Sequence, residues 1–232
     1  MKGLIIGMGE VGKALYAVLK DTHEIHTKDL DNAKIPARVD VMHVCLRYSG
    51  DFKRIVDRYA SECHPDIIDI CTTVPPGTTE RIYGACHSTT RGLHPNLETS
   101  LRTFVKHIGG EQAYELAKYY NEAGIKTKIH ATAKTTEIAH ILSNSVYGIN
   151  VIFAQEMADL CRDYGVDYTE AVVAYNQTSN DGYLKLGHPS KMRMILTPPG
   201  KKIGGHCVTQ NANLIPQEKR GTLLGMLAGY GK

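Results

Sequence analysis

The sequence has no tryptophan, no tract of basic residues and no long hydrophobic run. A bilayer-spanning helix needs about 20 consecutive apolar residues, so we expect no membrane segment. The net charge is only +3, and nucleic-acid-binding proteins usually carry clustered lysines and arginines, so we expect no nucleic-acid partner. The first residues read as a core strand rather than as a signal peptide. Together these absences predict a cytoplasmic protein.

The six cysteines also lack the C-x-x-C spacing that is typical of zinc knuckles and disulfide-rich scaffolds. Three of them stand beside a histidine, in the pairs Cys63-His64, Cys86-His87 and His206-Cys207. Adjacent residues make poor metal ligands without further partners, so the sequence predicts no metal site. Free thiols in a reducing compartment agree with a cytoplasmic location.

A glycine-rich turn stands at the start of the chain. An apolar run at residues 4–6 leads into G-M-G-E-V-G at residues 7–12, and a helical pattern follows. This order matches the G-x-G-x-x-G of dinucleotide-binding units, in which a helix N-terminus offers free N–H groups to a pyrophosphate. The alternative is a glycine turn in an α/β protein that binds no nucleotide. The predicted cofactor contacts are Gly7, Met8, Gly9, Glu10, Val11 and Gly12.

Asp29 indicates which dinucleotide the turn prefers. It follows a second strand-like run at residues 24–27, close to where an acidic residue meets the ribose hydroxyls of NAD. Its carboxylate would repel the additional phosphate of NADP, so the sequence predicts NAD as the cofactor. The neighbouring Lys28 moderates that preference.

Strand-like and helical patterns alternate through the first part of the chain. This alternation is typical of a doubly wound, mainly parallel sheet, so residues 1–130 are predicted to form an NAD-binding Rossmann domain of the α/β class. After the glycine turn and its helix, we expect strands at residues 24–27, 38–45, 66–71 and 126–130, helices at 51–60, 78–86 and 111–123, and a strand end or loop at 91–96.

Residues 131–232 are predicted to form a helical domain. Residues 135–164 contain no proline and place apolar side chains at helical spacing, which predicts one long central helix. A second helix is expected at 167–175, and residues 176–207 are expected to be rich in loops. The long helix is too apolar to stand alone on so small a domain, so we expect it to form the core of a homodimer. The alternative is burial within one chain.

Cys207 lies in a second glycine-rich segment, which reads I-G-G-H-C. Its small neighbours let a ligand approach the sulfur, and His206, Lys201 and Lys202 would favour the thiolate. The two lysines are also candidate contacts for an anionic substrate. The alternatives are a structural cysteine at the edge of a loop and solvated surface charges.

The long helix also carries a polar face formed by Glu137, His140 and Asn144. His140 is a candidate general acid or base near neutral pH, and Asn144 is a candidate for orienting a hydroxyl or carbonyl group. Thr72 and Thr73 follow a predicted strand, where ligands gather in doubly wound sheets, so we expect them near the nicotinamide. The alternatives are a polar stripe at the domain junction and an ordinary Pro-Gly turn.

These motifs keep the order found in the nucleotide-sugar dehydrogenases of the UDP-glucose, GDP-mannose and UDP-N-acetylmannosamine group, which the chain resembles over roughly residues 1–210. The resemblance implies an N-terminal Rossmann domain, a central helical domain that dimerises and a further domain that holds the substrate's nucleotide. We expect that last domain to be missing, because the chain stops at Lys232. The segments that carry the resemblance include G-M-G-E-V-G, D-L-D, T-T-V-P-P-G-T-T-E, T-T-E-I-A-H-I-L-S-N and I-G-G-H-C.

The resemblance also implies roles for single residues. Members of this family oxidise a sugar alcohol to a carboxylate in two NAD-dependent steps, through a cysteine that carries a thiohemiacetal and then a thioester. Cys207 falls at the position of that cysteine, Thr73 matches a family threonine, and Asn144 matches a family asparagine on the helix.

Other positions depart from the family pattern. The catalytic lysine of the helix is His140 here, and two family carboxylates near the substrate are Asn96 and Asn211. A neutral asparagine cannot accept a proton, so thioester hydrolysis is expected to be impaired, typically by about 10²–10⁴ in rate for each lost group.

Two functions are consistent with these residues. The first is an NAD-dependent oxidoreductase that acts on an alcohol or aldehyde of a sugar nucleotide or of a smaller anionic substrate. The alternative is a protein that binds NAD without turnover and regulates, or pairs with, a full-length dehydrogenase. The residues expected near the substrate are Asn96, Lys201, Lys202 and Asn211.

Overall fold

The computed structural model describes residues 1–30, 34–88, 90–93, 95–198, 200, 214 and 222. The chain divides into two compact units, Met1–His140 and Ile141–Lys232, and each is described by itself. The predicted boundary at residue 130 stays a prediction. No helix among the described residues is long and apolar enough to cross a membrane.

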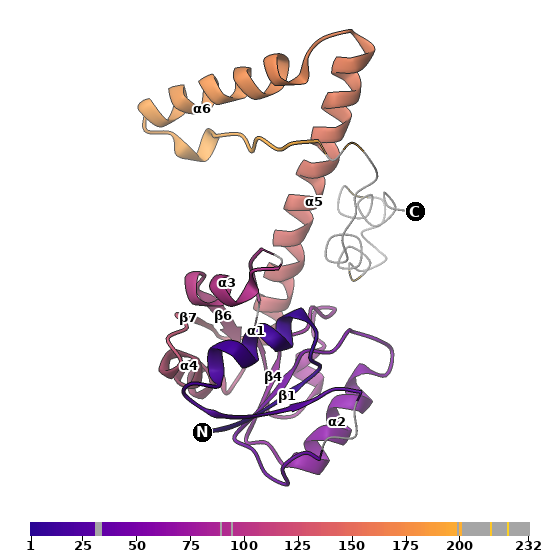
Figure 1. The fold of residues 1–232 in the computed structure, drawn as a ribbon, viewed down its shortest axis with the longest axis vertical. Coiled ribbons are helices and arrows are strands. Elements are labelled where there is room, and N and C mark those ends of the chain that lie inside the picture. Colours follow the sequence, from indigo (N-terminus) through magenta and orange to yellow (C-terminus); the bar gives the residue numbers. More distant parts are fainter. Residues whose placement is uncertain are drawn as a thin grey trace. The chain divides into compact units, whose positions relative to one another are not determined.

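A seven-stranded sheet forms the centre of the first unit (Figure 1). Its strand order is β2-β1-β3-β4-β5-β6-β7, and every neighbouring pair is parallel except β5 and β6. The predicted Rossmann-type sheet is therefore confirmed. The strand order reverses between β1 and β3, which is where open α/β sheets bind ligands. The strands are β1 (Lys2–Ile6), β2 (Glu24–Lys28), β3 (Val41–Val44), β4 (Ile67–Ile70), β5 (Ala85–Ser88), β6 (Lys106–Gly109) and β7 (Thr127–His130).

Two apolar clusters cover the two faces of this sheet. Successive side chains of a strand point to opposite faces, so Ile5 of β1 belongs to one cluster and Leu4 and Ile6 belong to the other. The cluster of Ile5 also contains buried residues of α1, α3 and α4, whereas the other contains Phe52 and Val56 of α2. The helices are α1 (Glu10–Leu19), α2 (Phe52–Cys63), α3 (Leu97–Thr103) and α4 (Ala113–Glu122).

Two predictions for this unit are wrong or incomplete. Residues 78–86 are not a helix: a single 3-10 turn, η1 (Thr79–Arg81), precedes strand β5. Gly84 has a φ of 68°, which ends the turn, and Ala85 and Cys86 then pair with Ile68 and Asp69 of β4. The short antiparallel strand β6 was not predicted, because four residues give little periodic signal.

The long helix predicted at residues 135–164 is confirmed as α5 (Ala133–Asp163). It begins in the first unit and continues into the second, where a π-helical turn, η2 (Thr169–Ala174), a further helix, α6 (Tyr175–Lys185), and a 3-10 turn, η3 (Pro189–Lys191), follow. The segment at residues 176–207 was predicted to be rich in loops, and part of it is therefore helical.

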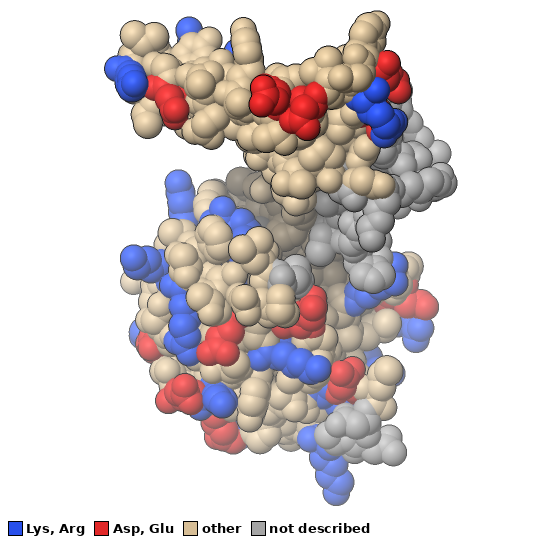
Figure 2. Space-filling model, turned by 45° about the horizontal axis from the view of Figure 1, so that its top comes forward, with Lys and Arg blue, Asp and Glu red and all other residues tan. Residues whose placement is uncertain are grey.

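The charged side chains are mixed on the face of the molecule that Figure 2 shows, with acidic and basic residues interspersed.

The sequence N-Q-T-S-N-D-G favours turns, yet it forms α6 because side-chain contacts hold it. The Asn180 amide donates to the carbonyl oxygen of Arg193 at 2.9 Å, and its oxygen accepts the Arg193 N–H at 2.8 Å. Gln177 also bonds Asp181 one helical turn ahead, at 3.1 Å. These contacts outweigh the weak helix propensity of the segment.

Candidate functional site

The glycine turn between β1 and α1 needs glycine at its first position. Gly7 has a φ of 93°, and its N–H donates to the carbonyl of Lys28 at 2.7 Å. A Cβ added there would lie 2.8 Å from the carbonyl oxygen of Cys45. The turn is therefore wedged against the end of β3, where a side chain has no room.

The other two glycines of the motif, Gly9 and Gly12, differ in the space that a side chain would have. A Cβ on Gly12 would lie 2.0 Å from the carbonyl oxygen of Gly7, so α1 packs directly on the turn. A Cβ on Gly9 would have no atom within 4 Å, and Gly9 is the N-cap of α1. The open backbone at a helix N-terminus is the arrangement that binds the phosphates of a dinucleotide.

Asp29 lies against this turn. The N–H of Met8 donates to its carboxylate oxygen Oδ2 at 3.2 Å, which ties the end of β2 to the glycines. Met8 and Val11 are partly buried against the apolar core, and Glu10 opens the first turn of α1. The structure thus places the predicted cofactor residues of the turn together.

The loop after β4 is anchored to the end of β3. The Thr72 hydroxyl lies 3.1 Å from the carbonyl oxygen of Val44 and 2.6 Å from that of Leu46, and donates to them. Thr72 is therefore a structural residue of this loop. Thr73, one of the predicted catalytic residues together with Cys207, His140 and Asn144, follows it and is half-buried.

The same loop is held to α5 by a buried carboxylate. Glu137 is fully buried, and its two oxygens accept the N–H groups of Gly77 and Thr79, the latter at 2.8 Å. The sequence grouped Glu137 with His140 and Asn144 on a polar face. Its contacts instead make it the anchor of the T-T-V-P-P-G-T-T loop.

His87 on β5 bridges this loop and the start of α5. Its Nε2 lies 3.2 Å from the carbonyl oxygen of Thr72, and its Nδ1 lies 2.8 Å from the Thr136 hydroxyl. Burial, and beyond it the nearby His140, lowers the pKa of His87 to about 3. The ring is therefore neutral near pH 7, and Nε2 carries the proton because a carbonyl can only accept.

His140 and Asn144 are half-buried residues one turn apart on α5. At about 100° per residue they lie roughly opposite the apolar stripe of that helix. Burial, followed by the positive charges of Lys106 and Arg91, lowers the pKa of His140 to about 4. The ring is therefore neutral near pH 7, and it is a weaker base than a free imidazole.

Of the remaining predicted residues, the structure describes Asn96. Asn96 is exposed and precedes α3, where its carbonyl accepts the Ser100 N–H at 3.2 Å. The predicted nucleophile and three predicted substrate contacts lie outside the described residues: Cys207, Lys201, Lys202 and Asn211.

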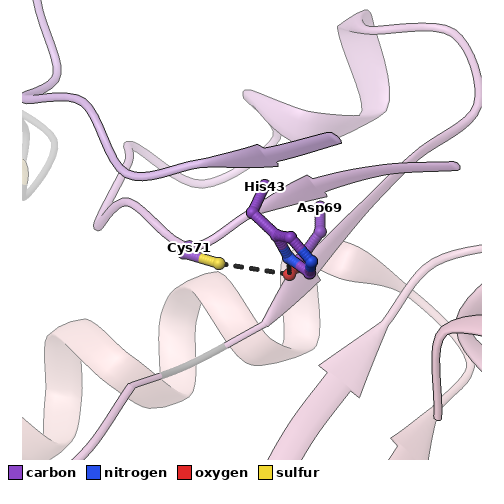
Figure 3. Close-up of side chains that lie close together, drawn as sticks. All are labelled: His43, Asp69 and Cys71. Atoms are coloured by element: carbon purple, nitrogen blue, oxygen red, sulfur yellow. Dashed lines mark hydrogen bonds and ion pairs between the residues drawn. The ribbon is translucent and has the colours of Figure 1, made fainter. Parts of the chain in front are cut away.

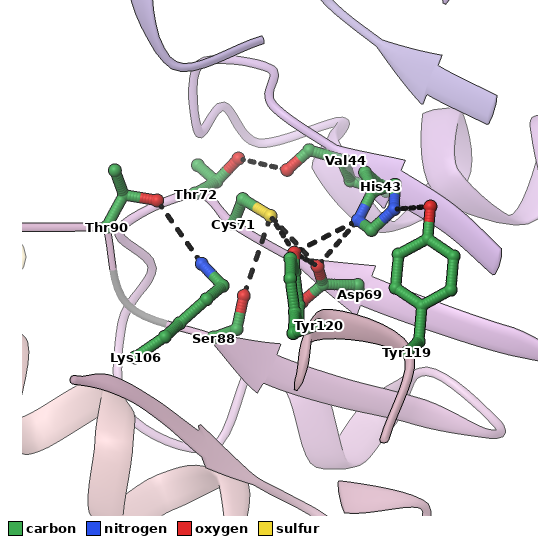
Figure 4. A network of polar contacts seen from close by, with 10 residues as sticks. All are labelled: His43, Val44, Asp69, Cys71, Thr72, Ser88, Thr90, Lys106, Tyr119 and Tyr120. Atoms are coloured by element: carbon green, nitrogen blue, oxygen red, sulfur yellow. Dashed lines mark hydrogen bonds and ion pairs between the residues drawn. The ribbon is translucent and has the colours of Figure 1, made fainter. Parts of the chain in front are cut away.

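A buried polar cluster beneath α4 was not predicted (Figures 3 and 4). His43 of β3 and Asp69 of β4 are fully buried, and Cys71 follows β4. The signal was available in the sequence, because V-M-H-V and I-I-D-I each place one polar residue inside an apolar strand.

Contacts within the cluster are close. His43 Nδ1 lies 2.8 Å from Asp69 Oδ2, and Cys71 Sγ lies 3.1 Å from the same oxygen. The Tyr120 hydroxyl also donates to that oxygen, and the Tyr119 hydroxyl lies 3.2 Å from His43 Nε2. Burial alone would lower the pKa of His43, but its hydrogen bond with Asp69 raises that pKa to about 9.

The fold and the glycine turn define a Rossmann-type α/β protein with an attached helical unit. Residues 134–222 match the model of the UDP-glucose/GDP-mannose dehydrogenase family, central domain. This match agrees with the resemblance seen in the sequence, over the part of the chain that it covers.

Named relatives carry the same similarity over a larger part of the chain. UDP-N-acetyl-D-mannosamine dehydrogenase of Methanocaldococcus jannaschii is 29% identical over 171 residues, which cover 68% of this chain and 37% of that protein. The structure of a UDP-D-ManNAc dehydrogenase from Pyrococcus horikoshii matches all of this chain and 68% of its own, with a TM-score of 0.78 and 21% identity. A 3-hydroxyisobutyrate dehydrogenase of Mycobacterium tuberculosis shares the fold at 13% identity, with a TM-score of 0.70 and coverage of 98% and 91% of the two chains.

Proposed function

We propose that the chain is an NAD-dependent oxidoreductase that acts on an alcohol or aldehyde of a sugar nucleotide or of a smaller anionic substrate. The observation that carries this proposal is the glycine turn, where an open Gly9 at the start of α1 stands beside a carboxylate bonded to Met8. Bound NAD would supply the hydride acceptor. Gly7, Gly9 and Gly12 would hold its pyrophosphate, and Asp29 would bind its ribose.

The reacting groups are proposed from the family and from the pKa values. Cys207 would attack the carbonyl carbon of an aldehyde, and Asn144 would orient the oxygen of the substrate. His140 is neutral near pH 7 and would accept the proton of the alcohol, in the role that a lysine fills in the family. Thr73 would lie beside the nicotinamide. Asn96, Lys201, Lys202 and Asn211 would contact the substrate.

A thermal shift of the purified chain with NAD, NADH, NADP and NADPH tests the cofactor. A ligand at 100 times its dissociation constant stabilises the folded state by about 2.7 kcal/mol, and we expect this with NAD or NADH. Equal shifts with NADP would contradict the role of Asp29. No shift with any dinucleotide would overturn the proposal, and a further shift with a UDP-sugar would identify the substrate class.

A homodimer through α5 is proposed from the exposed apolar side chains of that helix. Leu142 is 43% exposed, Phe153 is 56% exposed and Leu160 is 59% exposed, and their spacing places them on one face. A second copy of the chain would bury them.

A second candidate function is an NAD-binding protein without turnover that pairs with a full-length dehydrogenase. It is favoured by Asn96 and Asn211 at positions where the family has carboxylates, and by the low pKa of His140. The reactivity of the thiols separates the two functions. An active enzyme should show Cys207 alkylated faster than the other cysteines, at a rate that NAD changes, whereas uniformly slow labelling would favour the binding protein.

A further inference from the structure

The buried cluster beneath α4 gathers three side chains of the types that bind metal ions. His43, Asp69 and Cys71 each offer one ligand atom, and these atoms lie within 4.8 Å of one another (Figure 3). Neighbouring strands supply them, because β3 and β4 pair His43 directly with Asp69. Spacing along the chain does not reveal such a site, which is why the sequence predicted none.

The two oxygens of the Asp69 carboxylate differ in their hydrogen bonds. Its Oδ2 receives contacts from His43, Cys71 and Tyr120 together. Its Oδ1 is buried and has no hydrogen-bond partner among the described residues. A buried acceptor without a partner is costly, and a cation bound at Oδ1 would satisfy it.

We propose that His43, Asp69 and Cys71 bind one divalent transition-metal ion, for which Zn²⁺ is the best match. A thiolate, an imidazole and a carboxylate form a donor set that Zn²⁺ accepts, whereas Mg²⁺ and Ca²⁺ require oxygen ligands. One thiolate and one carboxylate cancel the charge of the ion, which suits a buried site. Ligand atoms around tetrahedral zinc lie about 3–4 Å apart, so only small shifts are needed.

Cys71 is held at the end of β4 beside β3. Its N–H donates to the carbonyl oxygen of Val44 at 3.0 Å, and Val44 is the last residue of β3. Cys71 is buried, with 8% of its surface exposed, and it follows the carboxyl end of β4.

The proton of His43 and one nearby charge oppose the ion, because an imidazole must be neutral to bind a metal. Lys106 is buried, with its ammonium 3.5 Å from the Thr90 hydroxyl and 4.9 Å from the ring centre of Tyr120 (Figure 4). A second positive group disfavours a cation, so we expect weaker binding than at a site with four thiolates.

Titration of the metal-free, reduced full chain with Co²⁺ tests this proposal. We expect one equivalent of Co²⁺ to produce thiolate-to-cobalt charge-transfer absorption that Zn²⁺ abolishes. Cys71→Ser should lose this absorption. Two matched controls should keep this absorption. Cys63→Ser changes a buried thiol that contacts Met42, and Cys207→Ser removes the thiol of the proposed nucleophile.

Two further measurements keep the test decisive if Cys71→Ser does not fold. Tyr120→Phe removes a hydrogen bond to Asp69 but no ligand, and should weaken Zn²⁺ binding by about 10-fold to 100-fold. X-ray absorption of the zinc-loaded wild type should show sulfur together with imidazole. Absence of binding, a shell without sulfur, or absorption lost in Cys207→Ser but not in Cys71→Ser would overturn the proposal.

Discussion

Gly9 and Gly12 lie on the same turn, but the space around them differs. A Cβ on Gly12 would collide with the backbone of Gly7, whereas a Cβ on Gly9 would meet open space. We therefore expect Gly12→Ala to destabilise the fold by about 1–3 kcal/mol, and Gly9→Ala to leave the melting temperature nearly unchanged while it weakens NAD binding. Thermal unfolding and NAD titration of both variants measure this. Equal melting temperatures would contradict the packing argument.

Glu137 is a single residue that positions a whole loop. Its carboxylate accepts two backbone N–H groups, and the amide of a glutamine would place a donor against one of them. We expect Glu137→Gln to lower the free energy of unfolding by about 1–3 kcal/mol, measured by urea denaturation. Glu80→Gln is the matched control: Glu80 pairs with Lys134 at the surface, at 2.9 Å, and such pairs contribute less than about 1 kcal/mol. Equal losses would argue against the anchor.

His87 should make stability depend on pH. Its folded pKa of about 3 lies below the ordinary value of 6.5, so between these values the unfolded chain binds the proton more readily. The contribution of His87 is present above pH 6.5 and is lost as the pH falls below it, by about 2 kcal/mol at pH 5. We expect His87→Gln to flatten this slope in urea denaturation between pH 5 and 7. An unchanged slope would assign the dependence to other groups.

At the scale of elements, α5 carries the apolar stripe that a dimer would bury. Leu142→Glu combined with Phe153→Glu should convert the proposed dimer into a folded monomer, because two charges cannot enter an apolar interface without partners. Light scattering gives the mass, and circular dichroism confirms the fold. Arg162→Glu, on the opposite side of the helix, should keep the dimer. A wild-type monomer at micromolar concentration would contradict the prediction.

The elements that the sequence predicted well are those with long periodic patterns or motif glycines. The segments that form β1, α1 and α5 have a clear hydrophobic period or clear ends in the sequence. By contrast, β5 and α6 are decided by contacts: Ala85 pairs with Ile68 across the sheet, and Asn180 bonds Arg193. Such partners are far away in sequence, so local propensity favoured the wrong structure at both places.

The candidate site was predictable to a similar degree. The glycine turn and Asp29 follow a spacing rule, and the structure places them together. The role of Glu137 was missed because its two partners lie 58 and 60 residues away. The cluster of His43, Asp69 and Cys71 was missed because adjacency of parallel strands, rather than spacing, assembles it.

At the scale of the whole molecule, the chain spans 37% of the curated relative that it matches over 171 residues. Activities named for the full-length relatives therefore stay proposals for this chain. The glycine turn, in contrast, lies entirely within the first unit, so the proposed cofactor binding can be measured without a substrate.

The order of the strands also bears on how the molecule behaves when concentrated. Among the residues that the structure describes, the sheet ends at β2 on one side and at β7 on the other, and open edges can recruit strands from other copies. Both edge strands are short, and they carry Lys28 and Lys128 respectively. Lysines on an edge strand oppose such pairing. We therefore expect Lys28 and Lys128 to disfavour fibrils in which a strand of another copy adds to either edge of the sheet.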